Sequence, residues 1–193
     1  MKPQFVISCP IDTYSGYGAR SRDVVKAIIE MDKYDVKILP QRWGATPWGF
    51  IEDHEEWEFL KQYFFHPEPN QQYPKPDIWM QITIPNEFQP QGHYSIGMTA
   101  GIETTLCKPE WIEGCNRMDL VVGSSKHTIQ VLKDSKFQQR NQQQQIVNSI
   151  ELTTKTEVLF EGYNENVYKK VNEYLDLPEI KEQFCFLFVG HGS

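Results

Sequence analysis

The sequence predicts an α/β fold with an open, mainly parallel, Rossmann-like sheet and helices on both faces. Short apolar runs recur along the chain on consecutive positions, which is typical of strands covered on both faces. Segments with apolar residues at helical spacing alternate with these runs. The 193 residues are 13% aromatic and 23% charged, which is enough apolar surface for one sizeable core or one core plus a fragment.

The first 40 residues read as a strand, a helix and a second strand. Residues 5–9 form an apolar run that Pro10 ends. Residues 24–33 place valine, isoleucine and methionine at the spacing of one helix face, and residues 36–39 return to strand character before Pro40. We therefore expect a βαβ unit with a right-handed crossover.

The middle of the chain alternates in the same way after a looser region. Residues 42–49 are an aromatic loop with glycines, a helix is expected near 54–63, and four prolines between 67 and 76 mark an extended connection. Three more strands are expected at 77–82, 94–98 and 119–122. Pro109 suits the first position of one helix, and Ser124 with Ser125 can cap another that runs to about residue 134.

The last third is expected to complete the first domain and to begin a second one. The glutamine-rich residues 137–145 read as a surface loop, and strands follow at 146–150 and 157–160. A helix is expected within 168–182, and residues 184–189 form a strongly apolar strand that needs cover on both faces. We therefore expect an acceptor-side domain over 1–183 and the first strand of a truncated second domain over 184–193.

Composition excludes several classes of protein. The formal net charge of −7 argues against general binding to nucleic acid or to anionic membrane surfaces. No apolar run approaches the roughly 20 residues of a transmembrane helix, and the first run is too short for a signal peptide, so a cytoplasmic protein is expected. The four cysteines lack CxxC spacing and the five histidines lack ligand spacing. Reduced thiols and no bound metal are therefore expected.

Glycines lie between the first strand and the first helix. Gly16 and Gly18 allow close backbone approach, and a helix start there presents amide protons to an anion. Arg20 and Arg22 lie at the positive end of the helix dipole, where an anionic ligand would relieve a local disadvantage. A phosphate site is one interpretation of this loop. The other is that both arginines pair with nearby surface carboxylates.

Two familiar nucleotide motifs are absent. Ser21 occupies the third glycine position of a GxGxxG fingerprint, and the second strand ends without an acid to hold a ribose. No GK[ST] sequence follows a glycine loop. A nicotinamide dehydrogenase and an ordinary nucleotide kinase are therefore both disfavoured.

The carboxylate of Glu103 is the main candidate for catalysis. It follows the predicted strand 94–98, at the sheet edge where ligands gather in open α/β folds. It would accept hydrogen bonds from sugar hydroxyls or act as a base, and the alternative is a solvated loop acid. His127 is a weaker candidate because it reads as a surface histidine.

Several short segments together resemble the N-terminal half of a GT-B nucleotide-sugar glycosyltransferase of the large retaining group. They occur in the order of that family and span nearly the whole chain: Gly16-Tyr17-Gly18 with Ser21-Arg22, Glu103-Thr104, Pro109-Glu110-Trp111, Cys115-Asn116, Asp119, Ser124-Ser125, and Val158 to Asn164.

The resemblance implies two Rossmann-like domains that face each other across a cleft, with this chain as the acceptor-side half. The donor is a nucleotide sugar, which is a substrate and not a cofactor, and the partners are a sugar or glycan acceptor and a missing C-terminal donor-binding domain. It implies ligand contacts for the glycine loop, including Tyr17 and Arg20, and for Glu103. It places Gly162 and Asn164 near the domain crossover, and lets Tyr17, Trp43 and Trp48 cover sugar faces.

The expected function is transfer of a sugar from a nucleotide-sugar donor to a hydroxyl acceptor. Residues 1–193 alone would lack the donor site. The alternative is a noncatalytic carbohydrate-binding or assembly module that keeps the Rossmann-like fold.

Overall fold

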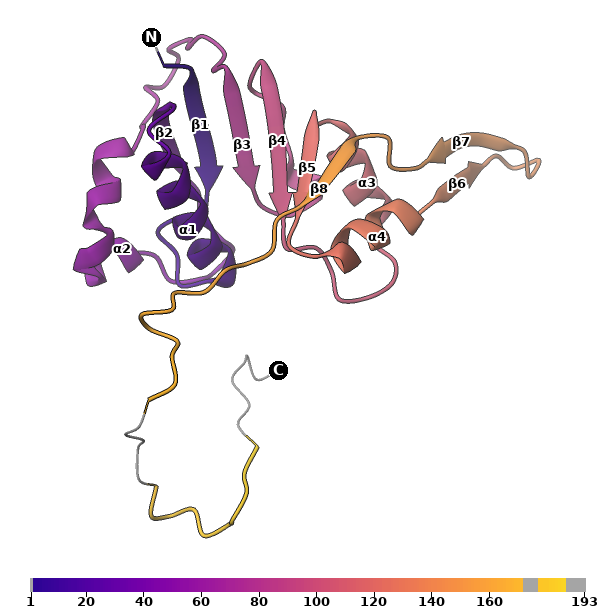
Figure 1. Cartoon of the computed structure of the whole chain (residues 1–193). Coiled ribbons are helices and arrows are strands. Elements are labelled where there is room, and N and C mark those ends of the chain that lie inside the picture. The colour runs from indigo at the N-terminus through magenta and orange to yellow at the C-terminus, as the bar shows by residue number, and fades with distance from the viewer. Residues whose placement is uncertain (1, 172–176, 187–193) are drawn as a thin grey trace. The chain divides into compact units, whose positions relative to one another are not determined.

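A six-stranded, all-parallel sheet forms the centre of the protein (Figure 1). The computed structural model describes residues 2–171 and 177–186. Its strand order is β2-β1-β3-β4-β5-β8. The strands are β1 (Gln4–Cys9), β2 (Asp35–Pro40), β3 (Ile78–Ile82), β4 (Tyr94–Thr99), β5 (Leu120–Gly123) and β8 (Lys155–Val158). The expected open, parallel α/β sheet is confirmed.

Helices cover both faces of this sheet, again as expected. The α-helices are α1 (Gly16–Glu30), α2 (Phe50–Asp53), α3 (Pro109–Asn116) and α4 (Lys126–Asp134), and the 3-10 helices are η1 (Glu55–Tyr63) and η2 (Pro85–Glu87). Residues of α1, α2 and η1 pack in one apolar cluster, and residues of α3 and α4 pack in another.

Alternation along the central strand explains the two clusters. Five of the six residues of β1 are buried. Phe5, Ile7 and Cys9 belong to the first cluster, while Val6 belongs to the second. Successive side chains of a strand point to opposite faces, so a buried strand supplies both cores.

The strand order creates a switch point beside β1. Strand β1 lies between β2 and β3, so the chain leaves β1 toward one edge of the sheet and leaves β3 toward the other. In open α/β sheets, ligands bind outside the carboxyl ends of the strands near such a point. This edge is therefore the first place to look for a functional site.

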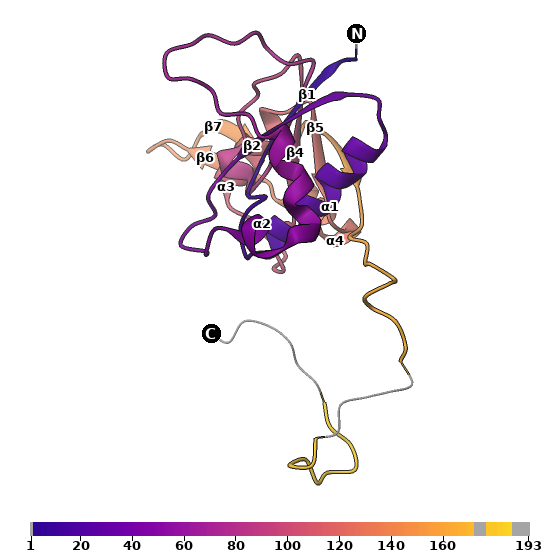
Figure 2. The ribbon, with the colours of Figure 1, turned by 90° about the vertical axis from the view of Figure 1, so that its left-hand side faces the viewer.

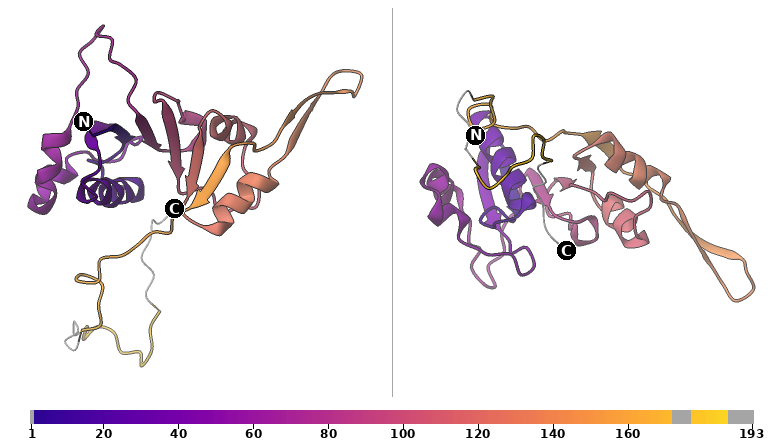
Figure 3. Two further views of the ribbon diagram at one scale, coloured as in Figure 1. Left: turned by 45° about the horizontal axis from the view of Figure 1, so that its top comes forward. Right: turned by 90° about the horizontal axis from the view of Figure 1, so that it is seen from below.

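The glutamine-rich segment corrects one expectation. Residues 137–145 were expected as a loop, but Phe137–Arg140 is strand β6, which pairs antiparallel with β7 (Ile146–Ile150) in a hairpin that projects from the sheet (Figure 3). The Asn141 side-chain oxygen accepts hydrogen bonds from two following backbone amides, at 2.9 and 3.0 Å. This local turn, together with the half-buried Phe137 and Ile150, forms the hairpin despite its polar sequence.

The connection from β2 to β3 is long and largely extended. The helix expected near 54–63 is the 3-10 helix η1, preceded by the single turn α2. The proline-bearing residues 64–77 then form a wide loop (Figure 2). Phe64 pairs with Ile38 in an isolated parallel bridge, which fixes the start of this loop beside β2.

The chain divides into two compact units, Met1–Glu161 and Gly162–Ser193. The division between 183 and 184 stays a prediction. In the second unit, the described parts of 168–182 and 184–189 contain no helix or strand, and the remaining residues of those two expected elements lie outside the described chain. Strand β8 begins two residues before the expected 157–160.

Candidate functional site

The carboxyl ends of β1, β2, β4, β5 and β8 share one edge of the sheet because all these strands are parallel. The segments at this edge are residues 10–15 with the first turn of α1, which holds Gly16 and Gly18, and residues 41–49, 100–108, 124–125 and 159–161. They bring together the glycine loop, the aromatic loop and the loop of Glu103, three segments that sequence analysis singled out. We call this set of segments the carboxyl edge.

The start of α1 is fixed by side-chain hydrogen bonds. The Ser15 hydroxyl caps the helix by accepting from the Gly18 amide at 2.9 Å. The Thr13 hydroxyl donates to the Pro10 carbonyl oxygen at 2.8 Å, and it lies 2.8 Å from the Ser15 hydroxyl. Because the Thr13 proton is used on Pro10, the Ser15 hydroxyl donates to Thr13. The helix start is therefore held before any ligand arrives.

The two glycines of this loop have different surroundings. A Cβ atom on Gly18 would lie 2.3 Å from the Thr13 carbonyl oxygen, which is too close for any side chain. A Cβ atom on Gly16 would meet nothing within 4 Å, and this residue is exposed. Gly18 thus lets the helix contact the preceding loop, while the space beside Gly16 is open to a ligand.

Tyr17 joins α1 to the end of β4. Its hydroxyl lies 3.0 Å from the Thr99 hydroxyl and accepts a hydrogen bond from the Ala100 amide at 3.1 Å. Its ring stacks on Trp43, with centroids 4.1 Å apart and planes at 26°. Burial, more than any neighbouring group, raises the pKa of the phenol, so it stays protonated at neutral pH.

Further aromatic side chains lie on the two neighbouring loops. Trp48 pairs with Thr13 in an isolated antiparallel bridge and is 39% exposed. The Arg42 guanidinium lies 5.6 Å from the centre of the Trp48 ring. Tyr14 is 41% exposed, and its hydroxyl donates to Asp53. The carboxyl edge therefore presents both a stacked aromatic pair and exposed rings.

The two arginines of α1 do not have the carboxylate partners considered from the sequence. The half-buried Arg20 donates to the carbonyl oxygens of Leu159 at 2.8 Å and Phe160 at 3.3 Å. Within the described residues, neither Arg20 nor Arg22 forms a salt bridge. Arg20 thus fixes the segment that leaves β8 while its charge stays near the start of α1.

Arg22 is a buried structural cation. It is 4% exposed, and it donates to the carbonyl oxygens of Ile11 at 2.8 Å and Thr13 at 3.1 Å. Its guanidinium lies 3.4 Å from the centre of the Phe50 ring. Burial lowers its pKa to about 10, which still leaves it charged at neutral pH. Arg22 therefore stabilises the loop after β1 and is not available to a ligand.

The loop after β4 is fixed at its start and open at Glu103. Ser124 and Thr128 each donate a hydroxyl proton to the Ala100 carbonyl oxygen at 2.8 Å. Gly101 has a φ of +90°, and a Cβ atom there would lie 2.3 Å from the Thr128 methyl group. Glu103 is exposed, and the described part of the chain gives its carboxylate no hydrogen bond or ion pair.

Gly162 and Asn164 lie in the second unit, outside the carboxyl edge as defined here. The space beside Gly162 is open, and the Asn164 side-chain oxygen accepts a hydrogen bond from the Asn166 amide at 3.0 Å. Their expected place near a domain crossover stays a prediction.

Some residues of this edge were not found from the sequence. Asp12 is 6% exposed, and its carboxylate accepts a hydrogen bond from the Ile51 amide at 2.7 Å. Thr99 binds the Tyr17 hydroxyl. Ser124 was expected as a helix cap, but its hydrogen bond to the Ala100 carbonyl oxygen was not. Asp12 lies shortly after the predicted strand 5–9, and Thr99 directly follows the predicted strand 94–98. A polar residue at the carboxyl end of a predicted strand is the signal that would have identified both.

The sheet, its strand order and the helices on its two faces define an open α/β protein of the Rossmann-like kind. No protein-family model matches the chain, and neither a curated protein nor a solved structure matches it. Among residues 2–171 and 177–186, no three His, Cys, Asp or Glu side chains are grouped as metal ligands. No helix in these ranges is long and apolar enough to span a bilayer.

Proposed function

We propose that this chain is the acceptor-side half of a nucleotide-sugar glycosyltransferase and that the acceptor sugar binds at the carboxyl edge. The observation that carries the proposal is the Tyr17–Trp43 stack, which the hydroxyl of Tyr17 ties to the end of β4. Sugar rings have apolar C–H faces that pack on aromatic rings and a rim of hydroxyls that needs hydrogen-bonding groups. The carboxyl edge offers both.

Each remaining candidate has a role in this proposal. The open space beside Gly16 admits a phosphate to the start of α1, and Arg20 supplies positive charge there. Glu103 orients the acceptor hydroxyl because its carboxylate is exposed on the loop after β4. Trp48 covers a second sugar face. Gly162 and Asn164 lead toward the donor-binding domain.

The reaction is a glycosyl transfer without a resident cofactor. A bond forms between the acceptor oxygen and the sugar carbon, the bond from that carbon to the donor phosphate breaks, and a nucleoside diphosphate leaves. The acceptor proton passes to a base. Most of the charge stabilisation for the leaving phosphate is assigned to the donor-binding domain, so this chain alone positions only one reactant.

We also propose that the protein is cytoplasmic. Cys9, Cys107 and Cys115 are free and buried, which suits a compartment that keeps thiols reduced. A noncatalytic carbohydrate-binding module is the alternative, and it shares the acceptor site but not the reaction.

The test compares two proteins in the same assay. One is residues 1–193, and the other is the product of the uninterrupted reading frame that contains them, expected to add about 150 to 200 residues as a second domain. Both are incubated with nucleotide sugars and with mono- and oligosaccharide acceptors, and products are detected by mass spectrometry. We expect transfer by the longer protein only, and less transfer after Glu103→Gln.

Two results would contradict the proposal. Robust transfer by residues 1–193 would show that no donor-side half is needed. A longer protein that binds saccharides and transfers none would favour the binding module.

A further inference from the structure

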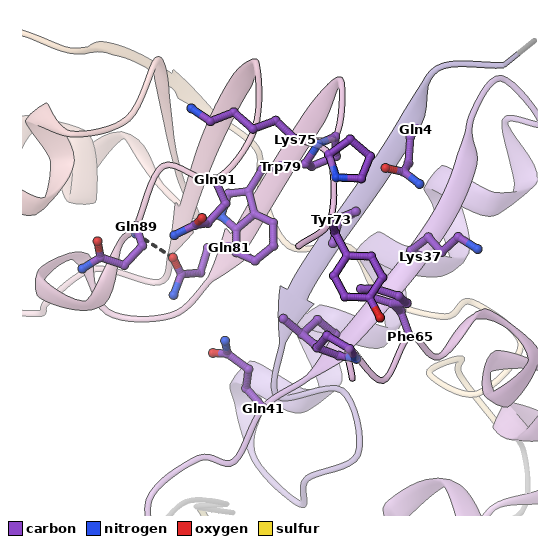
Figure 4. Close-up of a pocket in the computed structure, with 15 residues that line it drawn as sticks. Gln4, Lys37, Gln41, Phe65, Tyr73, Lys75, Trp79, Gln81, Gln89 and Gln91 are labelled. Atoms are coloured by element: carbon purple, nitrogen blue, oxygen red, sulfur yellow. Dashed lines mark hydrogen bonds between the residues drawn. The ribbon is translucent and has the colours of Figure 1, made fainter. Parts of the chain in front are cut away.

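A cavity of about 690 Å³, drawn in Figure 4, lies on the sheet face of Val6 and Trp79, which is opposite to the face that packs on α1. Its floor is formed by alternate residues of β2, β1 and β3, and its cover comes from residues 65–76 and 89–91. None of the described lining residues lies in a helix. This volume is within the range of small-molecule sites, so the cavity is large enough for a small ligand.

Two polar side-chain atoms are buried in the sheet beside this cavity without a hydrogen-bond partner in the described chain. Trp79 lines it and is 7% exposed, and the indole Nε1 has no hydrogen-bond partner. The Ser8 hydroxyl is also buried without one. Val6 pairs with Trp79 and Ser8 pairs with Gln81, so both polar groups belong to the cavity's face of the sheet. Protein atoms cover both of these polar atoms, so a ligand in the cavity would contact the Trp79 ring and the other lining groups instead.

The polar lining consists mainly of glutamine amides. The amide of Gln81 donates to the Glu87 carbonyl oxygen at 3.1 Å and accepts from the Gln89 backbone at 2.8 Å, so it fixes one wall. Four other lining glutamines have side-chain amides with no hydrogen bond to the described protein. They are Gln4, Gln41, Gln89 and Gln91. Each offers an uncharged donor and an uncharged acceptor, as ligand hydroxyls require.

Aromatic rings complete the lining. The rings of Phe65 and Tyr73 meet edge to face, with centroids 5.0 Å apart, and Trp79 lies on the floor near them. Lys37 and Lys75 also line the cavity, whereas none of its described lining residues is acidic. We propose that this cavity binds a small carbohydrate. Aromatic faces suit its C–H surfaces, free amides suit its hydroxyls, and the lysines favour a sugar that carries an acid group.

A nucleotide suits the cavity less well. Proteins hold phosphates with arginine forks, glycine-rich loops or the amides at helix starts. Among the described lining residues there is no arginine, glycine or helix start. The inference does not rest on the acceptor site proposed above, because among the described residues the two sites share only Gln41.

The proposal is tested by NMR titration of residues 1–193. Maltotriose, cellotriose, mannotriose, chitotriose and trigalacturonate are added in turn while the five tryptophan indole N–H signals are followed, and the Trp79→Phe variant assigns its signal. We expect at least one saccharide to shift the Trp79 signal in a saturable way. Trigalacturonate is expected to bind more tightly than the neutral sugars.

Two tyrosine variants provide the matched comparison. Tyr73 lines the cavity and is 39% exposed, while Tyr94 is 42% exposed and, as the partner of Ile78, lies on the other face of the sheet. Tyr73→Ala should weaken saccharide binding about tenfold because a ring contact is lost, and Tyr94→Ala should leave it unchanged. Both truncate exposed side chains, so both should fold.

Three results would overturn the proposal. The first is that no saccharide moves the Trp79 signal. The second is that uridine or guanosine monophosphate moves it and the sugars do not. The third is that sugars shift only the Trp43 signal, which would support the acceptor site and exclude this cavity.

Discussion

Gly18 and Gly16 are two residues apart in one helix turn, yet the structure uses them differently. A methyl group at position 18 would collide with the Thr13 carbonyl oxygen, whereas one at position 16 meets open space. We expect Gly18→Ala to lower the unfolding free energy by about 1–3 kcal/mol. Gly16→Ala should leave it equal or raise it by up to about 1 kcal/mol. Urea denaturation measures both, and equal losses would contradict the assigned packing role.

Arg20 is expected to contribute both to the stability of the fold and to the binding of a phosphate. Its hydrogen bonds reach two carbonyl oxygens after β8, so Arg20→Ala should loosen that segment and cost less than about 1 kcal/mol of unfolding free energy. If a phosphate binds at the start of α1, the same change should weaken it by about 1–3 kcal/mol. Calorimetric titration of nucleoside diphosphates and phosphorylated sugars measures this, with Arg20→Lys as the control that keeps the charge. Unchanged affinity for every ligand would remove Arg20 from the site.

Two buried thiols make stability depend on alkaline pH. Burial raises the pKa of Cys9 and Cys115 from 9.0 to about 12. Between these values the unfolded chain has lost protons that the folded chain keeps, so stability falls as pH rises. At a pH of about 10 each thiol should account for about 1 kcal/mol of this fall.

Variants isolate that contribution from the other alkaline groups. The double variant Cys9→Ala/Cys115→Ala should lose less unfolding free energy than the unmodified chain between pH about 8 and about 10. Cys185→Ala is the control because Cys185 is exposed. Equal slopes for all three proteins would show that the buried thiols do not control the pH dependence.

At the scale of elements, the spacing of apolar residues identified the strands of the main sheet. It did not identify strand β6 or the contacts between distant residues. The strands near 5–9, 36–39, 77–82, 94–98 and 119–122 were predicted because buried parallel strands have an unbroken apolar sequence. Residues 137–140 have no such pattern, and they form β6 because of the turn at Asn141. Nor does periodicity show that Tyr17 reaches Thr99, since that contact joins residues 82 positions apart.

The β6–β7 hairpin should be dispensable for the fold. It forms a separate two-stranded sheet, and among its described side chains only the half-buried Phe137 and Ile150 pack on the main core. Isolated two-stranded hairpins are marginally stable, so replacing residues 138–149 by a short glycine turn should change the unfolding free energy by less than about 1 kcal/mol. Thermal denaturation followed by circular dichroism measures this. Loss of the cooperative transition would show that the hairpin is part of the core.

At the scale of the whole molecule, the fold and the activity rest on different observations. The open α/β class follows from the alternation of apolar strands and helices, and the structure has it. The candidate site could be predicted from the sequence only in part. The sequence indicated the glycine loop, the aromatic loop and Glu103, but not the hydrogen bonds that fix them. A fold of this kind supports many activities, so the acceptor role depends on the chemistry of the carboxyl edge.

The measurement that tests this role most directly is a map of saccharide binding on residues 1–193. Backbone amide and indole signals are followed by NMR while acceptor saccharides are added, and the same titration is repeated with Trp43→Ala. We expect shifts at Gly16, Tyr17, Trp43 and Ala100, and at least about tenfold weaker binding by the variant. Saccharides that leave all four signals in place, or bind the variant equally well, would contradict an acceptor site at the carboxyl edge.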